Sequence, residues 1–305
     1  MVNRDSVQIA RYIRILRGGS QPVLVQASDG LFYAVKFKNN LQGANILLNE
    51  AAGTELFRAC GLASVPWKPL LLTPDFVDKN PDCWMRTPTG VLRPEPGLCF
   101  GSRFLGASGL RPLEILPGAY FSRVRNRMSF WLARVVDICA QHADNRQALF
   151  VEDAEGWLDA FFIDHGHLFG GPKGCAQPDL KASAYLDSRI YADVLSNELE
   201  GFLQLPRTLN TDDLWQLVNA LPADWKTKSA LLGFEQCLNR LANENLLRNV
   251  MDSVVDTERR RTGFERNRTR NQFENRSALL HDRIPPQPVR IHDCGSYWSS
   301  CSAVG

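Results

Sequence analysis

An apolar run that ends in an acidic, glycine-rich loop lies near the middle of the sequence. Residues 157–163 have the length and composition of a buried strand, and they lead directly into residues 164–171, which contain three glycines. The strand would deliver Asp164 to a tight loop, because glycine adopts the backbone conformations that such a loop needs. Carboxylate oxygens are preferred ligands of Mg²⁺. We therefore predict that Asp164 holds a magnesium ion.

Two histidines in the same loop leave other interpretations open. His165 and His167 could join Asp164 as ligands of zinc or iron, but such a site needs a third or fourth ligand. Only His142 is otherwise well placed to supply one. A tight loop with purely structural histidines is the third interpretation.

A polar loop stands between a predicted amphipathic helix and the first of two short apolar strands. In this loop, residues 141–147, Asp144 is the candidate base for an acceptor hydroxyl. Gln147 or Asn145 could give a carbonyl oxygen to Mg²⁺. Arg146 could neutralise charge on a transferring phosphoryl group. A polar surface turn would explain the same composition without any chemistry.

The N-terminal forty residues predict a β-hairpin that carries a lysine. Residues 28–30 favour its turn because Asp-Gly supports positive φ, and residues 31–37 form the returning strand. Lys36 is conspicuous in this apolar strand, and its ammonium could reach the α- and β-phosphates of a nucleotide. Glu50, on a helix predicted for residues 44–60, would orient it through an ion pair. The alternative is a strand-end lysine in solvent and a glutamate on the wet face of the helix.

A glycine-containing turn precedes the hairpin. Gly18 and Gly19 could let backbone N–H groups approach phosphates, with Ser20 and Gln21 as further donors. The alternative is an ordinary hairpin turn, because a Gly-Gly pair alone is not specific.

These pieces occur in one chain order, and each has a role in phosphoryl transfer, a reaction that depends more on positioning and charge neutralisation than on covalent chemistry. Together they resemble the HipA-like kinase family over roughly residues 8–175 and, more loosely, to about residue 255. The resemblance is carried by Gly18-Gly19-Ser20-Gln21-Pro22, Val35-Lys36-Phe37, Asn49-Glu50, Phe100-Gly101-Ser102-Arg103, Asp144-Asn145-Arg146-Gln147 and Ile163-Asp164-His165-Gly166-His167.

The resemblance implies an α+β, two-lobed protein-kinase-like fold with ATP and Mg²⁺ in the cleft. Residues 1–102 would form a β-rich N-lobe and residues 103–255 a mainly helical C-lobe that carries the catalytic and metal loops. HipA proteins proper are Ser/Thr kinases of bacterial toxin–antitoxin systems. The expected activity is therefore transfer of the γ-phosphoryl group of ATP to an unidentified hydroxyl acceptor, such as a protein Ser or Thr.

The chain departs from HipA proper at one position. In HipA proper, the catalytic Asp is followed five residues later by a metal-binding Asn. In this sequence, the residue five positions after Asp144 is Leu149. Asn145 and Gln147 are the only nearby amides for a second metal ligand, which argues against a simple toxin assignment. The alternative function is a nucleotide-binding pseudokinase that acts as an interaction module.

Composition and cysteine usage favour a cytoplasmic protein. The formal net charge of +2 gives no global argument for binding to nucleic acid or membrane, and no apolar stretch is long enough to span a bilayer. The eight cysteines form no CxxC pair, so we expect reduced thiols, with a disulfide considered only for Cys294 and Cys301. The N-terminus shows no apolar segment typical of a signal peptide.

The last fifty residues differ from the rest of the chain. Residues 256–305 lose the apolar helical period and contain a proline cluster, so we expect a helical extension that becomes a flexible tail. Nine arginines stand against five acidic residues between Asp256 and Arg290. This tail is either simply solvated or a contact arm for an acidic partner or nucleic acid.

Several other segments have predicted structures. The five prolines within residues 73–96 predict a loop insertion, and helical periods predict helices at about 191–204, 211–220 and 226–255. Asn210 is one of the candidate N-caps of the middle helix.

Overall fold

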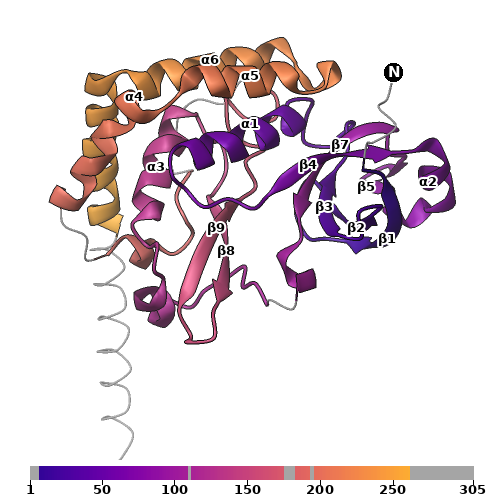
Figure 1. Ribbon diagram of the computed structural model, residues 1–305, viewed down its shortest axis with the longest axis horizontal. Helices are drawn as coiled ribbons and strands as arrows, with labels where there is room; N and C mark the ends of the chain where they lie inside the picture. The colour runs from indigo at the N-terminus through magenta and orange to yellow at the C-terminus, as the bar shows by residue number, and fades with distance from the viewer. Residues whose placement is uncertain (1–6, 109–110, 175–182, 193–195, 262–305) are drawn as a thin grey trace, which may run out of the picture. The chain divides into compact units, whose positions relative to one another are not determined.

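The computed structural model describes residues 7–108, 111–174, 183–192 and 196–261 (Figure 1). The strands are β1 Ile9–Ile15, β2 Val23–Ala27, β3 Phe32–Lys36, β4 Trp67–Leu72, β5 Met85–Thr87, β6 Gly90–Leu92, β7 Gly97–Arg103, β8 Gln147–Glu152 and β9 Leu158–Ile163. The α-helices are α1 Ile46–Ala59, α2 Pro74–Lys79, α3 Ser129–Cys139, α4 Leu205–Thr208, α5 Thr211–Ala220, α6 Lys228–Ala242 and a last one at residues 244–261. Short 3₁₀ helices occupy Pro81–Cys83, Leu105–Ser108, Gly118–Arg123, Ser188–Tyr191, Ser196–Gln204 and Ala223–Trp225.

A five-stranded antiparallel sheet forms the N-terminal part, in the order β1-β2-β3-β7-β4. The predicted turn between β2 and β3 is confirmed, with Asp29 accepting a hydrogen bond from the Leu31 N–H at 3.1 Å. Strand β3 is the middle strand, and Lys36 at its end pairs with Phe100 of β7. The sheet therefore places Lys36 at its centre, next to the helical part of the molecule.

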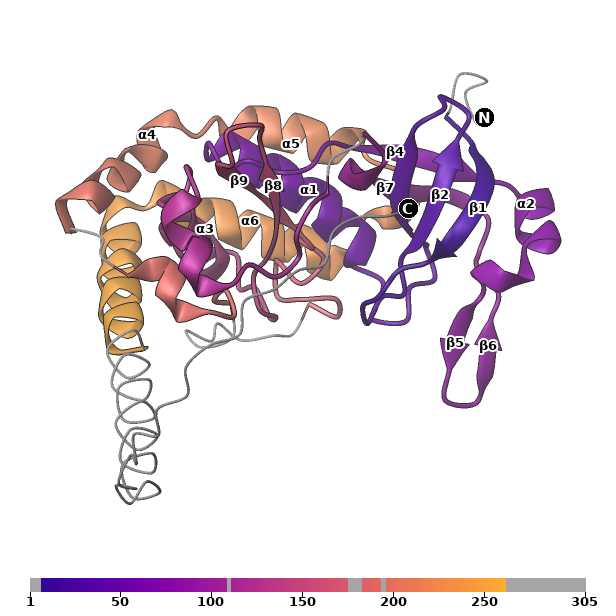
Figure 2. The same ribbon diagram turned by 90° about the horizontal axis from the view of Figure 1, so that it is seen from below.

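The segment 73–96 is structured, and the prediction of a loop there was wrong. Thr73 caps helix α2 by accepting a hydrogen bond from the Phe76 N–H at 3.2 Å, and the first helical residue is a proline, which suits that position. Strands β5 and β6 then form a hairpin that projects from the sheet (Figure 2). The prolines lie at helix starts and in turns, where they do not oppose secondary structure.

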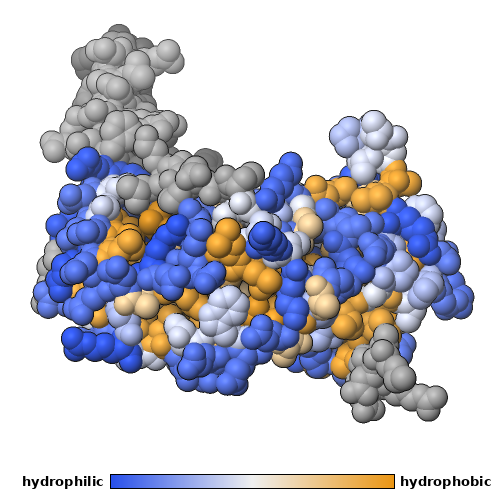
Figure 3. Space-filling view, turned by 90° about the horizontal axis from the view of Figure 1, so that it is seen from above, coloured by the Kyte–Doolittle hydropathy of each residue, from blue (hydrophilic) through white to orange (hydrophobic). Residues whose placement is uncertain are grey.

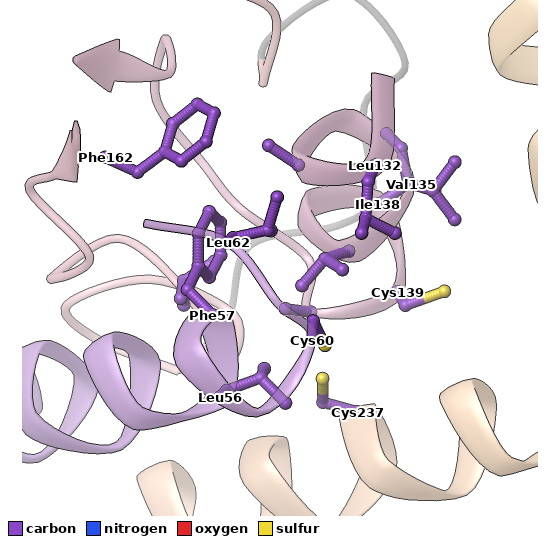
Figure 4. Close-up of a cluster of buried hydrophobic side chains, with 14 of the residues drawn as sticks. Leu56, Phe57, Cys60, Leu62, Leu132, Val135, Ile138, Cys139, Phe162 and Cys237 are labelled. Atoms are coloured by element: carbon purple, nitrogen blue, oxygen red, sulfur yellow. The ribbon is translucent and has the colours of Figure 1, made fainter. Parts of the chain in front are cut away.

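Helix α1 is buried on almost every side, as expected of a helix inside a core rather than on its surface. Its apolar residues belong to the larger core, together with α3 and α6, whereas the sheet has a smaller core of its own. Figure 4 shows Cys60, Cys139 and Cys237 meeting where these three helices converge. The free thiols of the described cysteines, Cys60, Cys83, Cys99, Cys139 and Cys237, are all buried.

The C-terminal helices follow the predicted order with two differences. The helix predicted for 191–204 is two 3₁₀ segments, at Ser188–Tyr191 and Ser196–Gln204, and the helix predicted for 226–255 is broken at Asn243. Asn243 adopts an extended backbone and caps the next helix, since its side chain accepts a hydrogen bond from the Leu246 N–H at 3.0 Å. The predicted cap Asn210 is confirmed for α5.

The helix of residues 244–261 crosses the boundary predicted at residue 255. Glu258 and Arg134 of α3 form an ion pair at 3.1 Å, and neither side chain is exposed. A buried ion pair of this kind ties the end of the helix to the core. The remainder of the predicted arginine-rich tail lies outside the described residues, so its role as a contact arm stays a prediction.

Among the described residues, no helix combines the length and the hydropathy that a bilayer crossing requires. On the face shown in Figure 3, hydrophobic residues appear in separate groups between hydrophilic ones. Leu232 of α6, which is half exposed, is one of the exposed large hydrophobic residues.

Candidate functional site

Lys36 is the point at which the sheet, helix α1 and the acidic loop meet. Its Nζ donates to Glu50 Oε1 and, at 2.7 Å, to Asp164 Oδ1, which is 128 residues away in sequence. Burial alone would lower the pKa of the Lys36 ammonium, but the carboxylates of Asp164 and Glu50 outweigh it and raise the pKa above its ordinary value. Lys36 therefore carries its charge inside the protein.

Glu50 also holds the backbone of the loop that follows β9. Its Oε2 accepts from the His165 N–H at 3.1 Å and its Oε1 from the Gly166 N–H at 3.0 Å. The side chain is only 3% exposed, so these charge-assisted bonds are made away from solvent. Helix α1 therefore fixes both Lys36 and the start of this loop, residues 164–174, which we call the metal loop after the metal ion predicted at Asp164.

Asn49 holds the other side of the metal loop, a role that the sequence analysis did not assign. Its Nδ2 donates to the carbonyl oxygens of Gly166, Leu168 and Gly171 at 3.0, 2.7 and 3.3 Å, and the residue has no exposed surface. The signal available in the sequence was a polar residue on a helix that is apolar on its other faces. Asn49 and Glu50 therefore bind the carbonyl and N–H groups of one loop from adjacent positions.

Asp164 faces the cleft in a left-handed backbone conformation, with φ of 58°. Its Oδ2 accepts from Gln147 Nε2 at 3.0 Å, and about a quarter of its side chain is exposed, at 27%. Burial raises the pKa of this carboxyl, but Lys36 more than reverses that effect and holds the pKa well below its ordinary value. An ionised carboxylate beside an exposed amide is a donor set that suits Mg²⁺, since the Gln147 amide can turn its oxygen to a metal.

The loop that carries Asp144 runs beside the metal loop. The Ala143 N–H donates to His167 O at 3.0 Å and the Phe169 N–H donates to Ala140 O at 2.6 Å. Burial lowers the pKa of His167, and the nearby carboxylates of Asp164 and Asp144 only partly offset that effect. The two predicted loops thus come together, with Asp144 half buried and its neighbour Asn145 exposed.

The sequence predicted that Arg146 faces a transferring phosphoryl group, but its guanidinium is bonded inside the protein. Its Nε and Nη2 donate to the two carboxylate oxygens of Asp137 at 2.9 and 2.5 Å, and its Nη1 donates to Ile163 O at 3.0 Å. The guanidinium also lies 4.7 Å from the centroid of the Phe57 ring. Donors used in this buried network cannot contact a phosphate in the cleft, so the placement favours a structural role. The sequence signal was Asp137, an acid within an apolar helical stripe.

The three histidines near the cleft are mostly packed inside the protein. His165 lies 4.5 Å from Phe57, measured between ring centroids, and its Nδ1 is 3.3 Å from Arg146. His142 has no exposed side-chain surface, and its ring lies 6.5 Å from that of His167. In the part of the chain that the structure describes, no three or more His, Cys, Asp or Glu residues are arranged to hold a metal ion. The geometry therefore gives no support to the zinc or iron interpretation.

The glycine turn, residues 16–22, lies next to the loop that follows Lys36. Gly18 has φ of 135°, a conformation that side chains rarely adopt. Ser20 is buried, and its carbonyl oxygen accepts a bond from Asn40 Nδ2 at 3.4 Å. A Cβ on Gly19 would stand 3.0 Å from Gln42 Nε2. The turn therefore packs on the loop that follows Lys36.

A pocket of about 440 Å³ opens between that loop and the metal loop. It is lined by Leu41, Gln42, His167, Gly170, Gly171, Pro172 and Lys173. Gln42 Nε2 lies 3.0 Å from His167 Nε2 across the pocket wall. Gln42 thus touches both the metal loop and the neighbourhood of the glycine turn.

Leu149 lies on strand β8 two residues after Gln147 and therefore on the same face of the hairpin. It pairs with Phe161 of β9 and is half buried. An aliphatic side chain at this position cannot bind a metal ion. Next to Gln147 and Asp164, this face of the hairpin is therefore apolar.

Comparison with known proteins shows the fold. A structure of the Golgi casein kinase with manganese and ADP bound matches with a TM-score of 0.51 and 14% identity, over 81% of this chain and 73% of that chain. A second Golgi casein kinase structure matches with a TM-score of 0.52 and 13% identity, over 81% and 74%. No protein-family model matches the chain. No curated protein matches it either. The chain therefore has the predicted α+β, two-lobed, protein-kinase-like fold.

Proposed function

We propose that the chain is an ATP- and Mg²⁺-dependent phosphotransferase of HipA-like type, which transfers the γ-phosphoryl group to a hydroxyl acceptor such as a protein Ser or Thr. The observation that carries this proposal is the joint contact of Lys36 with Glu50 and Asp164. A buried, charged lysine between a helix and a cleft-facing acid provides what phosphoryl transfer needs, a fixed cation beside a metal ligand.

Each cleft residue has one role in this proposal. Lys36, held by Glu50, positions the α- and β-phosphates, and the backbone of Gly18, Gly19 and Ser20 covers them. Asp164 and Gln147 would hold Mg²⁺, with exposed Asn145 as the remaining nearby amide. When bound, Mg²⁺ neutralises charge on the phosphate oxygens.

Asp144 is proposed as the base that accepts the proton of the acceptor hydroxyl. It stands on the loop that runs beside the metal loop, and the neighbouring Asn145 N–H donates to its Oδ1 at 2.7 Å, which holds the carboxylate in place. Arg146 takes no part in the transfer here and instead braces the Asp144 loop through Asp137.

A nucleotide-binding pseudokinase is the second candidate, and Leu149 is the observation that favours it. The cleft face of β8 offers Gln147 but an aliphatic side chain at the next cleft-facing position, so a second metal ligand must come from an exposed amide. A pseudokinase would bind ATP with Mg²⁺ but leave the radiolabel of γ-labelled ATP untransferred.

Thermal unfolding with and without ATP and Mg²⁺ tests the binding site. A ligand that binds only the folded state raises the melting temperature by mass action. We expect Lys36→Ala to abolish most of the increase seen for the unmodified chain. Lys68→Ala, which removes an exposed lysine paired with Asp29, should leave the increase unchanged. An equal increase in all three proteins would exclude Lys36 from the site.

Two acid variants test the assignment of roles. Asp164→Asn should weaken Mg²⁺-dependent nucleotide binding, because it removes the charge that attracts the metal. Asp144→Asn should leave binding nearly intact and stop transfer from γ-labelled ATP. If the two variants lose binding alike, the separation of metal ligand and base is incorrect.

A further inference from the structure

The side chain of Gln21 connects the glycine turn to the β5–β6 hairpin. Its Nε2 donates to Arg86 O at 2.7 Å, and its Oε1 accepts from the Arg86 N–H at 2.8 Å. One amide group thus satisfies both backbone groups of a strand residue, as a neighbouring strand would do. The two residues are 65 positions apart in sequence.

The hairpin is a firm anchor for this contact. Cys83 and Met85, at its base, are buried in the core of the five-stranded sheet. The 3₁₀ helix Pro81–Cys83 at this base contacts β1, so the base lies against the strand that leads into the glycine turn. Figure 2 shows the hairpin continuing outward from that base. Gln21 is therefore bonded to a hairpin whose base is packed into the core of the five-stranded sheet.

Gln21 itself adopts an unusual conformation. Its φ is 46°, in the left-handed region that favours glycine, and its N–H donates to Gly18 O at 3.1 Å to close the turn. A non-glycine residue holds such a conformation where surrounding contacts compensate for it. The two bonds to Arg86 supply that compensation and fix the turn on its outer side, while Asn40 holds Ser20 on its inner side.

We propose that Gln21 is a positioning residue for nucleotide phosphates: by docking on Arg86 of the β5–β6 hairpin, it holds the glycine turn in its phosphate-binding shape before the nucleotide arrives. The inference rests on the proposed function, because it assumes that phosphates bind under this turn. It also gives the β5–β6 hairpin a function as the outer support of the turn.

The physical effect is preorganisation. A free turn must lose backbone entropy when it closes over phosphates, whereas a docked turn has already lost it during folding. Releasing the turn should therefore weaken binding only to ligands that reach it. ADP has phosphates and adenosine has none, so the two ligands separate this role from a general loss of structure.

Calorimetric titration with ADP and Mg²⁺ and with adenosine tests the proposal. Gln21→Asn keeps an amide and tolerates positive φ, but its shorter side chain cannot span both Arg86 groups. We expect it to weaken ADP binding about tenfold relative to adenosine. Gln21→Ala should do the same, and Gln26→Ala, which removes a glutamine bonded to Gly30 O in the same sheet, should alter neither ligand.

Trypsin cleavage after Arg17 gives a readout that needs no nucleotide. Arg17 is exposed at the start of the glycine turn, so release of the turn should speed cleavage there in both Gln21 variants but not in Gln26→Ala. Unchanged cleavage with an unchanged ADP-to-adenosine ratio would overturn the role of Gln21 alone. Failure of the unmodified chain to bind ADP would overturn the proposed function and this inference together.

Discussion

The glycine turn and the metal loop are held by different kinds of interaction. The metal loop is bound by Glu50 and Asn49, which are 3% and 0% exposed. The glycine turn is bound mainly by Gln21, whose bonds to Arg86 are exposed to solvent. Buried charged and amide groups are costly to leave unpaired, whereas exposed ones exchange readily with water. The metal loop is therefore fixed by buried interactions made during folding, whereas the glycine turn is held by bonds that exchange with water.

The largest expected effect comes from removing the acid that holds the metal loop. Glu50→Ala leaves the Lys36 ammonium with one partner and two buried N–H groups with none. We expect the free energy of unfolding to fall by about 3–5 kcal/mol in urea denaturation. Glu55→Ala on the same helix, where the acid is 21% exposed and accepts from Trp67 Nε1 and Arg58 Nη1, should cost about 1 kcal/mol. Equal losses would remove the contrast between buried and exposed supports.

The second-largest expected effect comes from removing the end of the C-terminal helix. A chain that ends at Thr257 loses Glu258 and leaves the buried Arg134 without its carboxylate. We expect the free energy of unfolding to fall by about 3 kcal/mol relative to a chain that ends at Arg261. If both chains unfold at the same denaturant concentration, Glu258 is not part of the support.

A matched pair of asparagine variants compares the bonds that hold the metal loop with those on the side of the sheet. Asn49→Ala removes a buried amide that donates to three carbonyl groups of the metal loop, and the loop loses these bonds away from solvent, so we expect a loss of about 2 kcal/mol. Asn39→Ala, on the sheet side, removes two half-exposed bonds to Arg93 and Glu95 and should cost about 1 kcal/mol. Thermal unfolding of both variants measures the difference, which a larger loss for Asn39→Ala would contradict.

The smallest expected effect is a dependence on pH that arises from a buried histidine in the C-terminal part. Burial, and then the charge of Arg146, lowers the pKa of His142 well below its ordinary value. The folded chain therefore keeps this imidazole neutral while the unfolded chain protonates it below about pH 6.5. Its contribution to stability is complete above that pH and is lost as the pH falls, by about 1 kcal/mol between pH 6.5 and 5.5.

His142→Leu should remove this part of the pH dependence in denaturation measurements. The described sheet residues include no histidine, so Gln21 variants should keep the pH profile of the unmodified chain. A profile that His142→Leu leaves unchanged would assign the pH dependence to other groups.

Local sequence patterns were sufficient to predict the site residues that lie on a strand or helix with a clear apolar pattern. Lys36 and Asp164 were found because each ends an apolar strand, and Glu50 because it lies on a helix with a clear period. The β5–β6 hairpin was missed because its prolines outweighed the alternating residues around the turn. The break at Asn243 was missed because the apolar period continues across it.

Contacts that a side chain makes to backbone groups far away in the chain could not be predicted from the sequence. Gln21 bonds to the backbone of Arg86, and any residue type at that position would offer the same two groups. Asn49 likewise bonds only to carbonyl oxygens. Arg146 was misplaced because its partner, Asp137, decides where it points, and the helix pattern alone does not show that an acid faces inward.

Helix α6 packs on the metal loop and the C-terminal helix pairs with α3, and this sets when a newly made chain can complete its fold. A Cβ on Gly233 of α6 would lie 2.3 Å from Phe169 O, so the loop and that helix pack backbone to backbone. All strands of the sheet have been translated by Arg103, but Glu258 follows 155 residues later. At about 5–20 residues per second this interval lasts roughly 8–30 s. A nascent chain on the ribosome therefore has all strands of its sheet well before the helices that complete the C-terminal part have emerged.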